Sequence, residues 1–340
     1  MNKEIPYILL DKDFNIVKTS ENINAKKFNQ TFFENILNGF TSEDFDAPVN
    51  IDATLMGITD SSLIFNKKDE NIICYIVKRK NTKTNIRQNI SYRIREPVSG
   101  IFSVLPVIAD NINKSNTERA ISNLESVNQQ SYSLLRRINN ISLTSKILNN
   151  SLPSVSSIDF SLLLENIVTS VKTIEKNVVI ESDIEKNIYI NANHVMITNA
   201  VLNLISNSIN FKTDENVKIS IKLNKNKGNA VFSYSDNSKG IKEEHMPYIF
   251  NPYYSKDPYG EDNLDPYLGV GLFIAKTAFE QAEGKILLTS VFGEGISYTI
   301  SIPMEKDDND IFESSVSDFL MNRYSDIFIQ LSDSCILPSL

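Results

Sequence analysis

Apolar residues recur every three or four positions through residues 85–150, with one polar interruption at residues 111–116. This spacing is typical of amphipathic helices. The first run comprises Ile86, Ile90, Ile94, Val98, Ile101, Leu105 and Ile108, and the second Ile121, Leu124, Val127, Leu134, Leu135, Ile138, Ile141 and Ile147. We expect an antiparallel two-helix hairpin whose first helix is kinked at Pro97 and Pro106. Because one hairpin cannot bury its apolar seam alone, we predict a homodimer in which two hairpins form a four-helix bundle.

The other segments predict a multidomain chain of the α/β (α+β) class. Residues 1–80 alternate short apolar strands and polar turns around a helical run at residues 28–37. This order is similar to a small PAS-type sensor module, and an unclassified α+β domain fits equally. Residues 155–305 mix helical and strand-like runs, as an α/β domain does. Residues 306–340 begin as an acidic linker and then become amphipathic, so we expect one helix over residues 312–331.

Five short motifs follow one another in the α/β segment. They occupy residues 199–211, 236–241, 249–257, 268–276 and 293–300. In this order they resemble the motifs of the ATP-binding domain that histidine kinases share with gyrases and related ATPases. The resemblance implies a Bergerat-type α/β sandwich at residues 155–305 that binds ATP together with Mg²⁺.

The first motif carries the candidate magnesium ligand. Asn203 and Asn207 are four residues apart, so both project from one face of a helix. The resemblance implies that Asn207 holds Mg²⁺ against the triphosphate through its side-chain oxygen, and magnesium prefers oxygen ligands. The family often has Lys or Arg where Asn210 stands, so one charge that neutralises phosphate is missing.

Asp236 and Gly240 belong to a motif that in the family reads Asp-x-Gly-x-Gly. The resemblance assigns Asp236 to accept a hydrogen bond from the adenine amino group, a contact worth about 1.5–3 kcal/mol. Ser238 replaces the first glycine. If that position requires a positive φ, serine costs roughly 1–2 kcal/mol of backbone strain.

Three further glycines match the family. Gly269 and Gly271 precede a helical run and correspond to the phosphate loop, where backbone N–H groups approach the phosphates. Gly295 corresponds to the closing turn before the last strand. The lid of the family corresponds to residues 254–267, which carry four acids against Lys256. We expect this acidic lid to repel a triphosphate unless Mg²⁺ intervenes.

Residues 91–98, Ser-Tyr-Arg-Ile-Arg-Glu-Pro-Val, resemble the phosphoacceptor box of sensor histidine kinases, Ser-His-Glu-Leu-Arg-Thr-Pro-Leu. Tyr92 stands in place of the phosphoacceptor histidine. The chain has two histidines, His194 and His245, and both are far downstream. Glu96 stands where the family has a Thr or Asn, and a carboxylate there is a candidate base. Because no histidine stands in the box, we predict that autophosphorylation on histidine is absent. Tyrosine, whose unperturbed pKa is about 10, is a poor replacement for imidazole as nucleophile.

Composition and charge indicate which partners and which compartment to expect. A net charge of −8 argues against general nucleic-acid binding. No apolar run approaches the ~20 residues that span a bilayer, and the N-terminus lacks the pattern of a secretory signal. Cys74 and Cys335 stand alone in different regions, which suits a reducing compartment. We therefore expect a cytoplasmic protein without an integral membrane segment.

The resemblance implies a histidine kinase-like protein of two-component signal transduction. We expect a dimeric pseudokinase that binds ATP as an allosteric ligand and docks a response regulator or another kinase. A second hypothesis is an active protein kinase that phosphorylates a partner in trans, as anti-sigma-factor kinases do. A third is a structural adaptor that no longer binds nucleotide.

Overall fold

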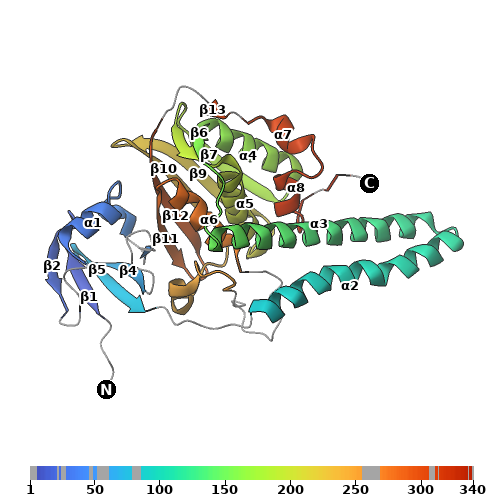
Figure 1. Cartoon of the computed structure of the whole chain (residues 1–340), viewed down its shortest axis with the longest axis horizontal. Helices are drawn as coiled ribbons and strands as arrows, with labels where there is room; N and C mark the ends of the chain where they lie inside the picture. The colour runs from blue at the N-terminus through green and yellow to red at the C-terminus, as the bar shows by residue number, and fades with distance from the viewer. Residues whose placement is uncertain are drawn as a thin grey trace, which may run out of the picture.

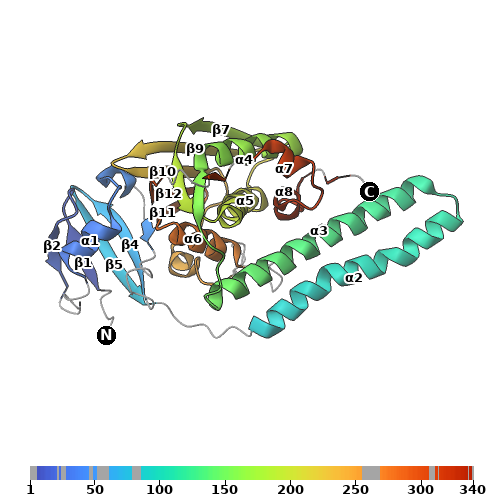
Figure 2. The ribbon, with the colours of Figure 1, turned by 45° about the horizontal axis from the view of Figure 1, so that its top comes forward.

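The computed structural model describes residues 6–20, 23, 28–45, 49–51, 61–78, 86–254, 269–305, 311–312, 314–335 and 337–338. These residues form an N-terminal module, a long helical hairpin, and an α/β domain with a C-terminal segment packed on it (Figure 1). The N-terminal module and the tip of the hairpin lie at opposite ends of the molecule, with the α/β domain between them (Figure 2).

The hairpin consists of α2 (Ile86–Asn113) and α3 (Thr117–Leu148), at the positions that the apolar periodicity predicts. Pro97 and Pro106 lie inside α2 and do not end it. Several large apolar side chains of the hairpin remain exposed, namely Phe102, Leu105, Val107, Ile112, Ile121, Leu124, Ile138 and Leu148. These side chains give the hairpin an exposed apolar surface on which a partner can pack.

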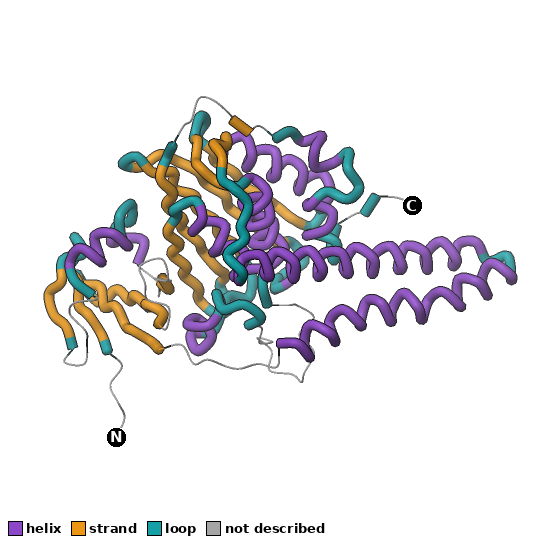
Figure 3. Tube along the Cα trace, in the orientation of Figure 1, coloured by secondary structure: helices purple, strands orange, loops and turns teal. Residues whose placement is uncertain are grey.

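The α/β domain stacks α4 (Phe160–Ile174), α5 (His194–Asn210) and α6 (Gly271–Gln281) on one face of a sheet (Figure 3). Its strands are β7 (Val178–Ile184), β9 (Val217–Asn226), β10 (Asn229–Asp236), β11 (Lys285–Val291) and β12 (Gly295–Pro303). A second, smaller sheet holds β6 (Ser156–Asp159), β8 (Tyr189–Ala192) and β13 (Ile311–Phe312). One apolar core lies between the helices and the large sheet, which confirms the mixed α/β class.

The N-terminal module has short strands on both sides of a helix, in the order that its sequence predicts. Its elements are β1 (Tyr7–Leu10), β2 (Ile16–Thr19), α1 (Gln30–Ile36), the 3₁₀ helix η1 (Ser42–Phe45), β3 (Val49–Ile51), β4 (Ser61–Lys68) and β5 (Asn71–Lys78). Strands β1 and β2 pair with each other, as do β4 and β5. The likeness to a PAS-type module stays a prediction.

The N-terminal module joins the α/β domain through a continuous sheet, a contact that the sequence did not predict. Strand β3 pairs antiparallel with β11, so the strand order runs β2-β1-β5-β4-β3-β11-β12-β10-β9-β7. Leu287 of β11 is buried in the apolar core of the N-terminal module. Gly39 approaches Ser301 of β12 so closely that an added Cβ would lie 2.5 Å from Ser301 Oγ.

The prediction of one helix over residues 312–331 was wrong. The structure has two short helices, α7 (Val316–Leu320) and α8 (Asp326–Gln330). Polar side chains form the break between them: Asn322 Oδ1 accepts the N–H of Tyr324 at 2.9 Å, and Ser325 Oγ donates to Phe319 O at 2.5 Å. Such local hydrogen bonds offer the backbone an alternative to a continuous helix.

The C-terminal segment, residues 314–335 and 337–338, lies between α3 and the α/β domain. Tyr132 of α3 donates its hydroxyl proton to Arg323 O at 2.6 Å. Gln330 is 1% exposed, and its Nε2 donates to Asn140 Oδ1 of α3 at 3.0 Å and to Asn199 Oδ1 of α5 at 2.8 Å. The segment therefore links the hairpin to the α/β domain through buried hydrogen bonds.

Candidate functional site

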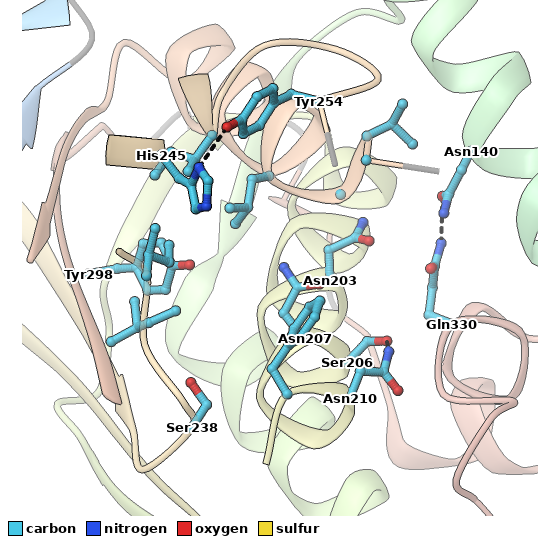
Figure 4. A pocket seen from close by; sticks show the side chains of 18 of the residues that line it. Asn140, Asn203, Ser206, Asn207, Asn210, Ser238, His245, Tyr254, Tyr298 and Gln330 are labelled. Atoms are coloured by element: carbon cyan, nitrogen blue, oxygen red, sulfur yellow. Dashed lines mark hydrogen bonds between the residues drawn. The ribbon is translucent and has the colours of Figure 1, made fainter. Parts of the chain in front are cut away.

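A cavity opens between α5, the start of α6 and hairpin helix α3. The loop after β10, the 3₁₀ helix η3 (Glu243–Tyr248), strand β12 and the end of α8 complete its walls (Figure 4). Five of the seven predicted nucleotide-binding residues border it, namely Asn203, Asn207, Gly240, Gly269 and Gly271. The other two, Asp236 and Gly295, are not among the residues that border it.

The polar face of α5 carries the candidate magnesium ligand. Asn203 and Asn207 lie on this face, as their spacing predicts (Figure 4). Asn203 is buried, and its Nδ2 donates to Asn199 O at 2.8 Å. Asn207 is half-buried and borders the cavity. Its amide oxygen is therefore better placed than that of Asn203 to share Mg²⁺ with a nucleotide.

The start of α6 suits an anion. The N-cap residue is Val270, whose side chain offers no acceptor to the N–H groups of the first turn. Such N–H groups and the helix dipole favour negative charge, phosphate included. Gly269 has φ +66°, a conformation that side chains rarely adopt. At Gly271 a Cβ would lie 2.9 Å from Asn203 Oδ1, so the close approach of α6 to α5 explains this glycine.

Asp236 ends β10, and donors of the protein hold its carboxylate. Oδ1 accepts the backbone N–H of Ser238 at 2.9 Å, and Oδ2 accepts a hydrogen bond from Ser208 Oγ. Ser208 Oγ also lies 2.6 Å from Tyr234 Oη. Burial, assisted by the Asp236 charge, raises the pKa of Tyr234 well above its ordinary value. A carboxylate offers about four acceptor positions, so Asp236 retains capacity for the adenine contact that the resemblance implies.

Close backbone packing explains Gly240 and Gly295. Gly240 has φ +71°, and a Cβ there would lie 2.3 Å from Val291 O. Gly295 has φ +124°, and a Cβ there would lie 2.0 Å from Asp236 O. Both glycines thus shape the turn beside Asp236. Ser238 is not among the described residues with positive φ, so the strain considered for it does not arise.

Sequence reasoning missed the wall of the cavity that α3 and α8 provide. Arg136, Arg137 and Asn140 of α3 border it, together with Gln330. The adjacent arginines were visible in the sequence, but which face of α3 meets the α/β domain is set by packing. Within the described chain, the charged residues bordering the cavity are Arg136, Arg137 and Lys242, with no carboxylate among them. This charge favours an anionic ligand.

His245 and Tyr254 form the edge of the cavity where the lid segment begins (Figure 4). Tyr254 Oη and His245 Nδ1 are 3.0 Å apart and share a hydrogen bond. Burial raises the pKa of Tyr254 to about 12, so its hydroxyl keeps its proton at neutral pH. Residues 255–268, which include most of the predicted acidic lid, lie outside the described residues.

The phosphoacceptor-like box lies on α2, close to the same cavity. Tyr92 is part of this helix, and its side chain lies outside the described residues. Glu96, one helical turn further on, accepts a hydrogen bond from Arg137 Nη1 at 2.8 Å. Because Arg137 borders the cavity, this ion pair connects the cavity to the box.

Comparison with known proteins supports the ATP-binding domain. Residues 192–306 match the family described as histidine kinase-, DNA gyrase B-, and HSP90-like ATPase. The chain is 25% identical over 219 residues to the heme sensor protein HssS of Staphylococcus haemolyticus, covering 64% of this chain and 46% of that protein. It is 25% identical over 280 residues to the autoinducer 2 sensor kinase/phosphatase LuxQ of Vibrio harveyi, covering 76% of this chain and 31% of that protein.

Among solved structures, histidine kinase ThkA in complex with response regulator protein TrrA matches 89% of this chain and 96% of that chain, at 15% identity and a TM-score of 0.44. The chain spans less than half the length of the two curated relatives above. The ATPase domain and the named relatives identify the chain as a relative of the sensor histidine kinases. Within the described residues, no helix has the length and apolar content to cross a membrane.

Proposed function

We propose that this histidine kinase-like chain binds Mg-ATP without phosphorylating itself on histidine and acts as a regulatory scaffold in two-component signalling. The observation that carries the proposal is the cavity, whose bordering charges within the described chain are all basic. It also combines the amide face of α5 with the uncapped start of α6. These groups suit a magnesium-bound triphosphate. Tyr92 removes the imidazole that serves the family as nucleophile at neutral pH.

Bound ATP acts as an allosteric ligand in this proposal. The α/β domain and α3 share the cavity. A ligand that contacts both therefore stabilises the arrangement in which they are packed together, and it shifts the population toward that arrangement. Asn207 shares the magnesium ion, the start of α6 receives phosphate oxygens, and Asp236 lies on the adenine side.

The scaffold is a homodimer. The exposed apolar residues of the hairpin support this assignment, because a second hairpin would cover them in a four-helix bundle; Phe102, for example, is 68% exposed. We propose that this bundle docks a response regulator or another kinase in the cytoplasm.

Calorimetric titration of the full chain with Mg-ATP tests the proposal. We expect binding in the wild type, a loss of about tenfold or more in Asn207→Ala because a magnesium ligand is removed, and no change in Asn224→Ala. Asn224 is exposed on β9 and does not border the cavity, so it is the matched control. A wild-type chain that binds no nucleotide would leave the structural adaptor as the function.

A second candidate function, a kinase acting in trans, is favoured by one observation: the predicted nucleotide-binding residues that border the cavity, Asn207 and Gly271 among them, all belong to the α/β domain. The loss of the histidine therefore leaves the site itself intact. Incubation with γ-labelled ATP distinguishes the two functions. We expect no label on the chain. Label on a partner protein that disappears with Asn207→Ala would establish the trans kinase instead.

A further inference from the structure

Among the described residues of the α/β domain, Lys242 is the basic residue that borders the cavity, and it lies in the loop after β10. The face of α5 that borders it offers amide and hydroxyl groups, from Asn203, Ser206, Asn207 and Asn210. Proteins that bind triphosphates rely on cationic side chains to balance phosphate charge beside the metal. Within the described chain, the basic residues that border the cavity are Lys242, Arg136 and Arg137.

Position separates these three cations. Lys242 lies two residues after Gly240, in the loop after β10, and its ammonium is 5.4 Å from the ring centre of Phe292. Helix α3 lies on the other side: Figure 4 shows its Asn140 across α5 from Ser238. Helix α3 also contacts α6, whose start is the predicted phosphate loop. The two arginines are one turn before Asn140 on α3, so they belong to the same wall of the cavity, and we place the phosphates toward this wall.

Among the described residues, the two arginines pair with different carboxylates. Arg136 donates from Nη1 to Gln330 O at 3.2 Å and pairs with Asp333 of the C-terminal segment. Arg137 donates from Nη1 to Glu96 Oε2 at 2.8 Å, and the side chain of Glu96 is 51% exposed. Because Glu96 is half exposed, its carboxylate returns to water when a competing anion takes its place. A phosphate that presents several charged oxygens competes with it readily, because the guanidinium fork matches phosphate geometry.

We infer that Arg137 of the hairpin binds the terminal phosphates of the nucleotide and supplies the charge that Asn210 lacks. This inference rests on the proposed function and deepens it. Binding of the phosphates exchanges the carboxylate of Glu96 for phosphate oxygens. Glu96 lies one turn from Tyr92 on α2. ATP thus breaks the ion pair between Arg137 and Glu96, whereas AMP leaves it in place. This difference couples the bound nucleotide to the segment of α2 that corresponds to the phosphoacceptor box.

The test is calorimetry of the full chain with Mg-ATP, Mg-ADP and AMP. In Arg137→Gln we expect ATP affinity to fall about 10- to 100-fold, as for loss of a charge-assisted hydrogen bond, while AMP affinity stays unchanged. Arg119→Gln is the matched control, because Arg119 is an exposed arginine of the same helix. In Glu96→Gln we expect ATP to bind about 2- to 5-fold more tightly, because the charged competitor for Arg137 is removed.

Arg137→Lys guards against a variant that merely fails to fold. It keeps the charge and loses the fork, so ATP affinity should fall between the wild type and Arg137→Gln. The inference is overturned if Arg137→Gln binds ATP as the wild type does, or if it loses ATP and AMP equally. It is also overturned if Glu96→Gln weakens ATP binding. A wild-type chain that binds none of the three nucleotides overturns the proposed function itself.

Discussion

Replacing Gln330 by leucine should loosen the C-terminal segment from both of its neighbours. Gln330 is 1% exposed, and its Nε2 donates to Asn140 at 3.0 Å and to Asn199 at 2.8 Å. Leucine keeps the approximate volume but has no donor, so two buried amide oxygens lose this hydrogen bond. Each buried acceptor without a partner costs about 1–3 kcal/mol, and the added apolar burial offsets a part. We expect a net loss of about 2–4 kcal/mol in the stability of the segment.

Hydrogen exchange followed by mass spectrometry measures this loss locally. A loss of 2–4 kcal/mol corresponds to roughly 30- to 1000-fold faster exchange of the amides in residues 326–335. Gln281→Leu is the matched control, because the Nε2 of Gln281 donates to Pro153 O at 2.7 Å, away from the C-terminal segment. In this control, exchange in residues 326–335 should stay as in the wild type. Acceleration of less than about fivefold in Gln330→Leu would refute the role assigned to these hydrogen bonds.

Two further predictions concern the N-terminal module and pH. Gly39 and Gly228 both have a positive φ, +93° and +83°. A Cβ added at Gly39 would lie 2.5 Å from Ser301 Oγ, whereas a Cβ added at Gly228 would have no neighbour within 4 Å. Urea unfolding should show a loss of about 1–2 kcal/mol for Gly228→Ala and a larger loss for Gly39→Ala; equal losses would argue against the contact. Burial raises the pKa of Asp326, so its favourable contribution is complete below the ordinary aspartate pKa and is lost as the pH rises through the raised folded value. Asp326→Asn should therefore raise Tm relative to the wild type at neutral pH but not in acid. If the difference in Tm between the two proteins is the same at both pH values, the assignment is wrong.

Features that depend on near neighbours in the chain were predictable. The hairpin follows from a period of three to four apolar residues, and α5 presents Asn203 and Asn207 on one face for the same reason. The motifs also singled out Gly240 and Gly295, at which the backbone has a positive φ. Their physical reason was not predictable, because it is the approach of Val291 and Asp236 backbone oxygens from other strands.

Features that depend on tertiary packing were missed or wrong. The amphipathic pattern of residues 312–331 favours one helix, yet side-chain hydrogen bonds at Asn322 and Ser325 divide it in two. The pairing of β3 with β11 joins segments more than two hundred residues apart, and no local pattern encodes it. The arginine wall of the cavity likewise depends on which face of α3 meets the α/β domain.

The α/β domain is held at two places that are far apart in the molecule. Strand β3 extends its sheet on one side, and Gln330 and Arg136 tie it to α3 on the other. A kinase must bring its nucleotide in line with a nucleophile, which requires the two to meet in one geometry. In the proposed function Tyr92 does not serve as that nucleophile, so no such geometry is required. A nucleotide bound between α5 and α3 would instead add a third link to the same assembly, so its measurable effect should be greater rigidity of the hairpin rather than phosphotransfer.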